Sequence, residues 1–302
     1  MITVIALSPA LDVTYLVESV VDGSIHRPRE VLRCAGGKGL NLARAAQRMG
    51  SGVTVIAPLG GYIGALVESL GAPDVPLVVV PVAALTRTCV TIVADDDGRI
   101  TEFYEPNAEL STVECATFLA TASELPVDGW TVVSGSIAVG VDLAALVAML
   151  RQRGGDRLAL DTHGAALATL VDELRPALVK VNRHEAAELL GFEGDALEFA
   201  RLLRERSGGA VIVTDGSEGS AAVDDSGQWR VSSSAPAGRY PVGSGDTFLA
   251  GILTAFEGGQ SLAEALMLAS TCAAANAAIP GAAQFDPKLA IALREHTRVQ
   301  RL

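Results

Sequence analysis

Short runs of β-branched residues alternate with longer helical runs along most of this chain. The predicted strands lie at Ile2–Leu7, Val53–Ala57, Leu77–Val80, Thr131–Ser134, Arg157–Asp161, Leu178–Val181 and Val211–Thr214. The predicted helices lie between or after them, at Leu40–Met49, Tyr62–Leu70, Asp142–Gln152, Glu185–Leu190, Asp195–Ser207, Thr247–Glu257 and Ser261–Ala278. This alternation predicts an α/β fold of three layers around a mainly parallel sheet, with ligand sites at the carboxyl ends of the strands.

Composition and length agree with one large α/β domain. The chain has 302 residues, of which 49% are hydrophobic and only 4% aromatic, so the core must be built from Ala, Val, Leu and Ile. Such a core suits helices packed on parallel strands. Length alone allows two domains, but there is no internal repeat or flexible linker, and we predict a single domain over residues 1–302.

The net charge of −12 argues against nucleic acid and anionic membranes as partners. No run of Lys or Arg overrides this charge. If the substrates are polyanions, a few isolated cations must bind them, which draws attention to Lys38, Arg87 and Lys180.

The four cysteines form no CxxC pair, so the sequence predicts neither a zinc site nor a dithiol motif. Reduced thiols indicate a cytoplasmic protein. The N-terminal residues carry no basic leader, and the apolar run from Val75 to Leu85 is far shorter than a membrane helix.

Two pairs of extended segments interrupt the alternation. They are Val13–Val20 with Glu30–Cys34, and Thr88–Ala94 with Ile100–Tyr104. We expect them to form a small antiparallel sheet, from about residues 13–34 and 87–105, that acts as a lid over the site. An ordinary extension of the main sheet is the alternative. The exposed edges of a lid sheet can pair with a second subunit, so a homodimer through the lid is a further hypothesis.

The strongest local signal is the run Gly243-Ser244-Gly245-Asp246 at the start of an apolar helix. Unpaired N–H groups at a helix N-terminus favour negative charge and can hold a phosphoryl group during its transfer. Asp246 in this first turn can accept the proton of an attacking hydroxyl. The alternative is that Asp246 is a helix N-cap.

A second glycine cluster, Ala35-Gly-Gly-Lys-Gly-Leu-Asn, also opens a helix. Its spacing does not match a P-loop. Gly36, Gly37 and Gly39 permit a sugar to approach the backbone, and Lys38 and Asn41 offer donors to hydroxyls or phosphate. A tight loop without a ligand is the alternative.

Two single residues complete a candidate sugar site. Asp12 follows a predicted strand, where a carboxylate can accept hydrogen bonds from adjacent sugar hydroxyls, although it also suits a turn. Arg87 begins the second lid segment and can clamp a substrate phosphate, although a lone Arg is more often a solvated charge.

The segment Lys180-Val-Asn-Arg-His-Glu leads from a strand into a helix. Asn182 and Glu185 offer oxygen ligands to Mg²⁺, which is usually held by one or two carboxylates together with phosphates and water. A capping box between the two residues is the alternative. Further on, Thr214 and Gly216 lie in a glycine turn after a strand and can contact nucleotide phosphates, though many α/β proteins have such a turn without a ligand.

Taken together, these motifs resemble the PfkB, or ribokinase-like, family of carbohydrate kinases. Gly36-Gly-Lys-Gly-Leu-Asn-Leu-Ala-Arg looks like the family's N-terminal signature, Val242-Gly-Ser-Gly-Asp-Thr-Phe-Leu-Ala-Gly like its C-terminal signature, and Asn182-Arg-His-Glu like its Asn-x-x-Glu motif. The resemblance runs from about Ile2 to Gly281. It implies the ribokinase-like α/β/α sandwich with a small β-sheet lid.

Within the family, Ser8-Pro-Ala-Leu-Asp, Thr86-Arg-Thr and Thr101-Glu-Phe look most like the 1-phosphofructokinase and tagatose-6-phosphate kinase branch. The implied reaction is ATP-dependent phosphoryl transfer to a hydroxyl of fructose 1-phosphate, fructose 6-phosphate or tagatose 6-phosphate, with Mg²⁺ as cofactor. Kinases of an unphosphorylated sugar or a nucleoside, and a catalytically silent regulator that binds sugar phosphate, are the alternatives.

The resemblance also implies roles for individual residues. They are Asp246 as base; Gly243, Ser244 and Gly245 as anion hole; Asp12, Gly37, Lys38, Asn41, Arg87 and Ser136 at the sugar phosphate; Lys180, Asn182, Thr214, Gly216, Gly219 and Asn276 at ATP; and Glu185 at Mg²⁺ through water.

Some positions depart from the family pattern. Ile137-Ala138 follows Ser136 in place of leucine-proline, Val181 stands where proline is usual, and Tyr104-Glu-Pro-Asn replaces the usual run at the second lid segment. His26-Arg27 matches the branch's Asn-Arg pair only in part. These departures leave the identity of the sugar open.

Overall fold

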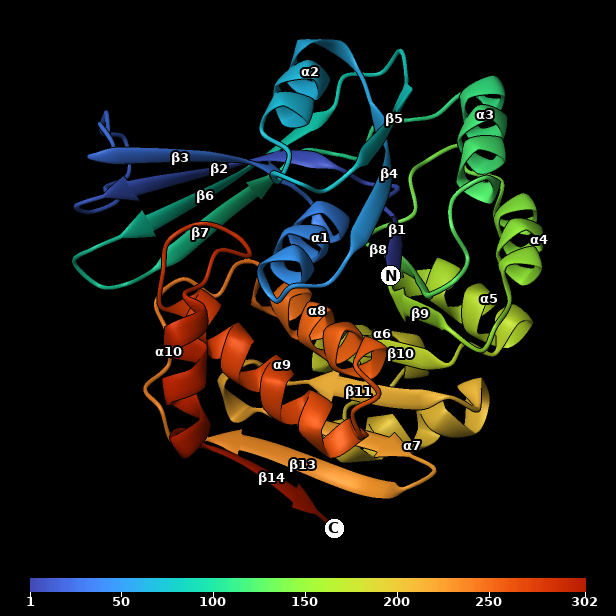
Figure 1. Cartoon of the computed structure of the whole chain (residues 1–302). Helices are drawn as coiled ribbons and strands as arrows, with labels where there is room; N and C mark the ends of the chain where they lie inside the picture. Colours follow the sequence, from blue (N-terminus) through green and yellow to red (C-terminus); the bar gives the residue numbers. More distant parts are fainter.

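The computed structural model describes all 302 residues and contains two separate sheets (Figure 1). The larger sheet has the strand order β14-β13-β12-β11-β10-β9-β8-β1-β4-β5. Its strands from β5 to β11 pair in parallel and are β1 (Ile2–Ile5), β4 (Val53–Leu59), β5 (Leu77–Pro81), β8 (Trp130–Ser134), β9 (Leu158–Asp161), β10 (Leu178–Asn182) and β11 (Ala210–Thr214). The antiparallel end is β12 (Ser220–Asp224), β13 (Gly227–Ser233) and β14 (Thr297–Arg301).

Helices cover both faces of this sheet because the side chains of its strands alternate between two cores. Ile2 and Val4 of β1 belong to one buried cluster, whereas Ile5 belongs to the other. The first cluster takes residues from α1 (Lys38–Arg48), α2 (Gly61–Ser69), α8 (Ser244–Glu257), α9 (Leu262–Ala277) and α10 (Pro287–Ala292). The second takes residues from α3 (Thr112–Ser123), α4 (Leu143–Arg153), α5 (Gly164–Leu174), α6 (Arg183–Leu190) and α7 (Ala196–Ser207). The fold is therefore the expected ribokinase-like three-layer sandwich.

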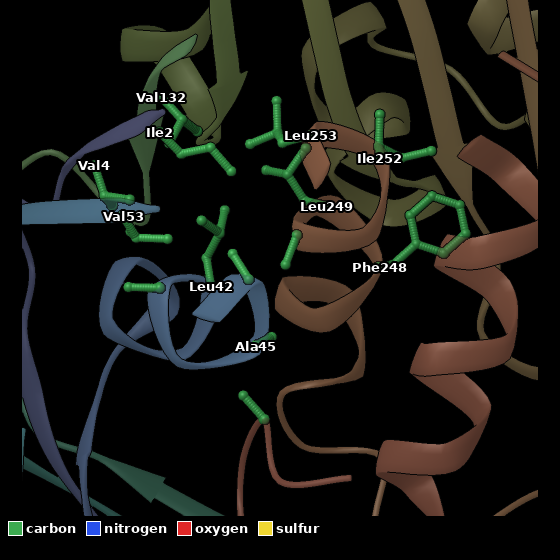
Figure 2. Packing of buried hydrophobic residues seen from close by; sticks show 14 of the residues in the cluster. Ile2, Val4, Leu42, Ala45, Val53, Val132, Phe248, Leu249, Ile252 and Leu253 are labelled. Carbon is green, nitrogen blue, oxygen red and sulfur yellow. The ribbon is translucent and has the colours of Figure 1, made fainter. Parts of the chain in front are cut away.

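Helices α1 and α8 pack side by side in the first core, as Figure 2 shows. Leu42 of α1 and Leu249 and Leu253 of α8 are fully buried in this cluster. Burying one such side chain contributes about 1.5–3 kcal/mol, and close-packed interiors resist small displacements. The contact therefore fixes the first turns of the two helices, which carry Asn41 and Asp246, relative to each other.

The smaller sheet projects from the body as an arm (Figure 1) and has the order β3-β2-β6-β7. Its strands are β2 (Ala10–Val17), β3 (Glu30–Gly36), β6 (Arg87–Ala94) and β7 (Ile100–Tyr104). It shares no strand with the larger sheet, so the alternative of an edge extension is wrong.

The expected antiparallel character of the lid holds for the two hairpins and fails at their junction. β2 pairs with β3, and β6 with β7, in antiparallel fashion, but β2 and β6 are parallel. The physical reason is that both strands leave the body at the same end, where Ala10 lies opposite Arg87.

The predicted strands and helices of the main body are all present, with ends shifted by a few residues. The helices α3, α5 and α10 and the antiparallel strands β12 to β14 were not predicted. No helix in the chain is long and apolar enough to cross a membrane.

Candidate active site

Asp246 is the third residue of α8, directly after a turn that only glycine allows. Gly243 precedes the helix with φ +78°, and a Cβ atom there would lie 2.5 Å from the backbone nitrogen of Ala283. The N–H groups of Gly245 and Asp246 have no partner in the protein, whereas the Ser244 N–H donates to Pro241 O at 3.0 Å. Two free donors therefore lie beside the Asp246 side chain, where an anion can bind.

The Asp246 carboxylate is buried, with 7% exposure, and makes no capping hydrogen bond to its own helix. The alternative that Asp246 is an N-cap is therefore wrong. Burial raises its pKa to about 6, helped by the nearby charge of Asp161 and opposed by Lys38 and Lys180. A carboxylate that titrates close to neutral pH is suited to accept a proton.

Asn41, in the first turn of α1, joins Asp246 to the lid. Its Nδ2 donates to Asp246 Oδ2 at 3.0 Å and more weakly to Asp12 Oδ2 at 3.4 Å. Asp12 lies in β2, and burial raises the pKa of its carboxyl against the opposing effects of Asn41 and Arg44. A Cβ on Gly36 would fall on the Asp12 carboxyl group, so this glycine leaves the space that the side chain fills.

Gly37 and Gly39 have structural reasons of their own. Gly37 has φ +85°, and a Cβ there would lie 2.6 Å from Ser8 O, while a Cβ on Gly39 would lie 2.5 Å from Ala6 Cβ. The glycine cluster therefore lets α1 begin directly against the segment that follows β1. This packing does not exclude a contact with a ligand, because Gly37 is only half-buried.

Two lysines meet at the buried carboxylate of Asp161, the last residue of β9. Lys38 Nζ lies 3.1 Å and Lys180 Nζ 3.5 Å from Asp161 Oδ1. Lys38 Nζ also donates to Glu185 Oε1 at 2.9 Å. Although burial opposes it, the charges of Asp161, Glu185 and Asp246 raise the pKa of Lys38 above its ordinary value.

Sequence reasoning missed Asp161. Although burial alone would raise the pKa of its carboxyl, Lys180 and Lys38 hold that pKa below its ordinary value. The only local signal is a charged residue ending the apolar strand Leu158–Asp161. Lys38, expected as a free cation for the sugar phosphate, is thus already paired with two carboxylates in this structure.

Asn182 and Glu185 form the capping box that was the alternative to a metal site. Asn182 Oδ1 accepts from the Glu185 N–H at 2.8 Å, and Glu185 Oε2 accepts from the Asn182 N–H at 2.9 Å. No group of three His, Cys, Asp or Glu side chains could hold a metal ion. The buried Asp161 Oδ2, however, has no hydrogen-bond partner. The carboxylate oxygens of Glu185 and Asp161 fit a Mg²⁺ ion held mainly by water and phosphates, and they are too few to coordinate the ion by themselves.

Arg87 lies at the base of the lid, at the start of β6. Its guanidinium is half-buried and reaches Ser8 O at 3.5 Å and Glu105 O at 3.4 Å, both weak contacts to carbonyl groups. No carboxylate pairs with it, so its charge is available to an anion. Ser136 follows β8, and its Oγ lies 2.9 Å from Nε2 of His163, a residue that the sequence did not indicate.

The expected ATP contacts divide into two groups. Thr214 ends β11 opposite Asn182, and Gly216 and Gly219 form the turn after it, around the 3-10 helix η1 (Gly216–Glu218). Asn276 differs from the expectation because it is fully buried. Its Nδ2 donates to Val242 O at 2.9 Å and to Ser244 Oγ at 3.0 Å, so it supports the glycine turn from behind.

Comparisons with known proteins identify the same family that the motifs indicated. The model of the pfkB family of carbohydrate kinases matches residues 2–289. The ATP-dependent 6-phosphofructokinase isozyme 2 of Mycobacterium tuberculosis is 31% identical over 93% of this chain and 85% of its own length.

Among solved structures, phosphofructokinase-2 of Escherichia coli in complex with substrates and products has a TM-score of 0.88 and 24% identity, covering 97% of this chain and 98% of its own. A "Possible 1-phosphofructokinase" of Thermotoga maritima has a TM-score of 0.89 and 22% identity, covering 100% and 99%. These structures share the fold. The chain is thus an ATP-dependent sugar kinase and belongs to the pfkB family of carbohydrate kinases.

Proposed function

We propose that this kinase phosphorylates a ketohexose monophosphate, with Asp246 as the general base. The observation that carries the proposal is the buried Asp246 carboxylate, with a pKa of about 6, beside the free N–H groups of Gly245 and Asp246. The base accepts the proton of the attacking hydroxyl while the amides stabilise the transferring phosphoryl group.

The sugar would lie between the lid and α1. We assign Asp12, Gly37 and Asn41 to its hydroxyls and Arg87 to its existing phosphate, with Ser136 nearby. Fructose 6-phosphate is the first candidate because the M. tuberculosis relative is named as a 6-phosphofructokinase. Fructose 1-phosphate and tagatose 6-phosphate are the other candidates.

ATP would lie over the carboxyl ends of β10 and β11. We assign Lys180 to its phosphates, and Asn182, Thr214, Gly216 and Gly219 to the nucleotide contacts in the adjacent turns. Asn276 would act indirectly, from behind the glycine turn. Mg²⁺ would be held through water by Glu185 together with the ATP phosphates, and supplies neutralisation of phosphate charge when bound.

Lys38 supports a second candidate, a kinase of an unphosphorylated sugar or a nucleoside. Lys38 is paired with Asp161 and Glu185 and is therefore not free to bind a substrate phosphate. Of the two cations expected at that phosphate, only Arg87 is unpaired, and a substrate without a phosphate would need neither. One panel separates the candidates: kcat/KM with fructose 6-phosphate, fructose 1-phosphate, tagatose 6-phosphate, fructose, ribose and adenosine. We expect at least a 100-fold preference for one phosphorylated ketohexose, and a preference for an unphosphorylated acceptor would overturn the proposal.

Asp246→Asn tests the role of the base in the same assay. Loss of a general base lowers turnover by about 10²–10⁴-fold, while the KM for ATP stays within about twofold. Turnover near that of the unaltered enzyme would remove Asp246 from the mechanism.

The lid supports a homodimer hypothesis. β3 and β7 are the unpaired edges of the lid sheet, and Phe103 and Tyr104 of β7 are 60% and 56% exposed. Light scattering tests it: a dimer that Phe103→Lys converts to a monomer is expected, and a monomeric unaltered protein would refute it.

A further inference from the structure

We propose that Arg44 is a positioning residue for the reaction: it holds the amide of Asn41 in the one orientation that presents a donor to Asp246. The proposal rests on the proposed role of Asp246 as base. Arg44 is on α1, one turn after Asn41, and makes no hydrogen bond to Asp246.

Arg44 is buried without forming an ion pair. The residue is 7% exposed, and the negative charge of Asp12 acts on it without a direct contact. Its guanidinium instead donates to Ala35 O, to Ala282 O at 2.8 Å, and to Asn41 Oδ1 at 3.0 Å. Taking a charge out of water is costly unless hydrogen bonds compensate it, so an apolar residue here would serve packing better. A buried guanidinium with three hydrogen-bond acceptors and no ion pair therefore indicates that Arg44 orients the groups to which it donates.

The chemistry of the neighbours determines the orientation of the amide. A guanidinium can only donate, so it selects the Oδ1 end of Asn41. The Nδ2 end then faces the carboxylates of Asp246 and Asp12. Without Arg44 the Oδ1 end of the amide loses its donor, and only the hydrogen bonds to Asp246 and Asp12 oppose a flip. A flipped Asn41 would present a carbonyl oxygen to a carboxylate, which disfavours the ionised form.

Arg44 also joins the parts of the site that must stay in register. Ala35 is in lid strand β3, and Ala282 follows α9 and lies behind the glycine turn, because a Cβ on Gly243 would lie 2.9 Å from Ala282 Cα. The charged groups that act on Asp246 are Asp161 on β9, Lys38 on α1 and Lys180 on β10, and Asp12 on β2 shares its Asn41 donor. Arg44 makes no hydrogen bond or ion pair with Asp246, and the contact between them runs through Asn41.

The test is the pH profile of kcat/KM for the best substrate, measured for Arg44→Gln, Arg44→Lys and Arg48→Gln. Arg48 is the matched control: it lies one turn further along α1 and donates to Phe285 O at 3.2 Å, so it ties α1 to the segment after α9 without touching Asn41. A hydrogen bond to a charged group is worth about one to two pKa units. We therefore expect the acidic limb to move up by about one unit in Arg44→Gln, by less in Arg44→Lys, and not at all in Arg48→Gln.

The shift has a distinctive consequence for activity. With the apparent pKa moved from about 6 to about 7, kcat/KM falls roughly fivefold at pH 6, and the ionisation-related loss disappears by pH 8.5. A purely structural role would lower activity equally at all pH values. A uniform loss in Arg44→Gln, or the same shift in Arg48→Gln, would overturn the proposal.

The double variant Asn41→Ala/Arg44→Gln separates orientation from the loss of positive charge. If Arg44 acts through Asn41, adding Arg44→Gln to Asn41→Ala moves the limb no further; a full additional shift would overturn the proposal. If Arg44→Gln does not fold, Arg44→Lys carries the same test. Near-normal turnover of Asp246→Asn would refute the proposed function itself, whereas an inactive Asp246→Asn with no shift in the Arg44 variants would refute only this inference.

Discussion

Replacing Asp246 with Asn should stabilise the fold at neutral pH while it removes activity. The carboxyl has an ordinary pKa of 3.8 and a folded pKa of about 6, raised mainly by burial. Between about pH 4 and 6 the folded chain therefore binds a proton that the unfolded chain has lost, and stability falls as pH rises through this window. Two units at 1.36 kcal/mol each mean that the ionised carboxylate costs about 3 kcal/mol above pH 6. Asparagine is neutral and avoids this cost.

Thermal and urea unfolding at two pH values measure the effect. At pH 7.5 we expect Asp246→Asn to gain about 3 kcal/mol, or roughly 6 °C in Tm for a chain of this size. At pH 4.5, where the folded carboxyl is mostly protonated, the gain should shrink to about 1 kcal/mol. The matched control is Asp142→Asn, at the exposed N-cap of α4, where Asn caps as well as Asp and stability should change by less than about 0.5 kcal/mol. A loss of stability, or an equal gain at both pH values, would refute the reasoning.

Three further substitutions test other parts of the site. Arg87→Ala should raise the KM for the sugar phosphate about tenfold or more while the KM for ATP stays within twofold, because its unpaired guanidinium loses a charge-assisted contact; equal effects on both would assign Arg87 to the lid. Gly243→Ala should cost several kcal/mol in urea unfolding, because φ is +78° and the Cβ meets backbone, whereas Gly259→Ala, at φ +72° with open space, should cost about 1 kcal/mol; similar losses would contradict the steric argument. Glu185→Gln keeps a capping oxygen but removes the charge, so titration with Mg²⁺ should show half-maximal activity at a concentration about tenfold higher; an unchanged titration would exclude Glu185 as a magnesium contact.

Local patterns in the sequence predicted what short-range physics determines. The alternation of strands and helices correctly predicted a mainly parallel sheet, and the glycine turn marked the start of α8 to within a few residues. At Asn182 and Glu185 the sequence allowed a capping box or a metal contact, and the capping box is present, with Glu185 Oε1 also paired to Lys38. One spacing can therefore serve two purposes, and spacing alone does not choose between them.

Features that depend on distant parts of the chain could not be predicted. Asp161 matters because Lys38 and Lys180 reach it from other elements, and nothing near it in the sequence records that. The parallel junction of β2 and β6 likewise depends on where two hairpins leave the body. Helix α3 is different, because the capping box of Ser111 and Glu114 is a local pattern that predicts the start of this helix.

The close packing of α1 against α8 has a consequence for how this enzyme can vary. Asn41 and Asp246 precede the buried Leu42 and Leu249 by one and three positions, so a change of side-chain volume between the helices alters the 3.0 Å contact between amide and base. Displacements of about 1 Å can lower turnover about 100-fold, whereas the same change of volume costs stability only modestly. Fewer substitutions between α1 and α8 should therefore preserve catalysis than preserve folding. Homologues that differ in this contact would have to change both helices together.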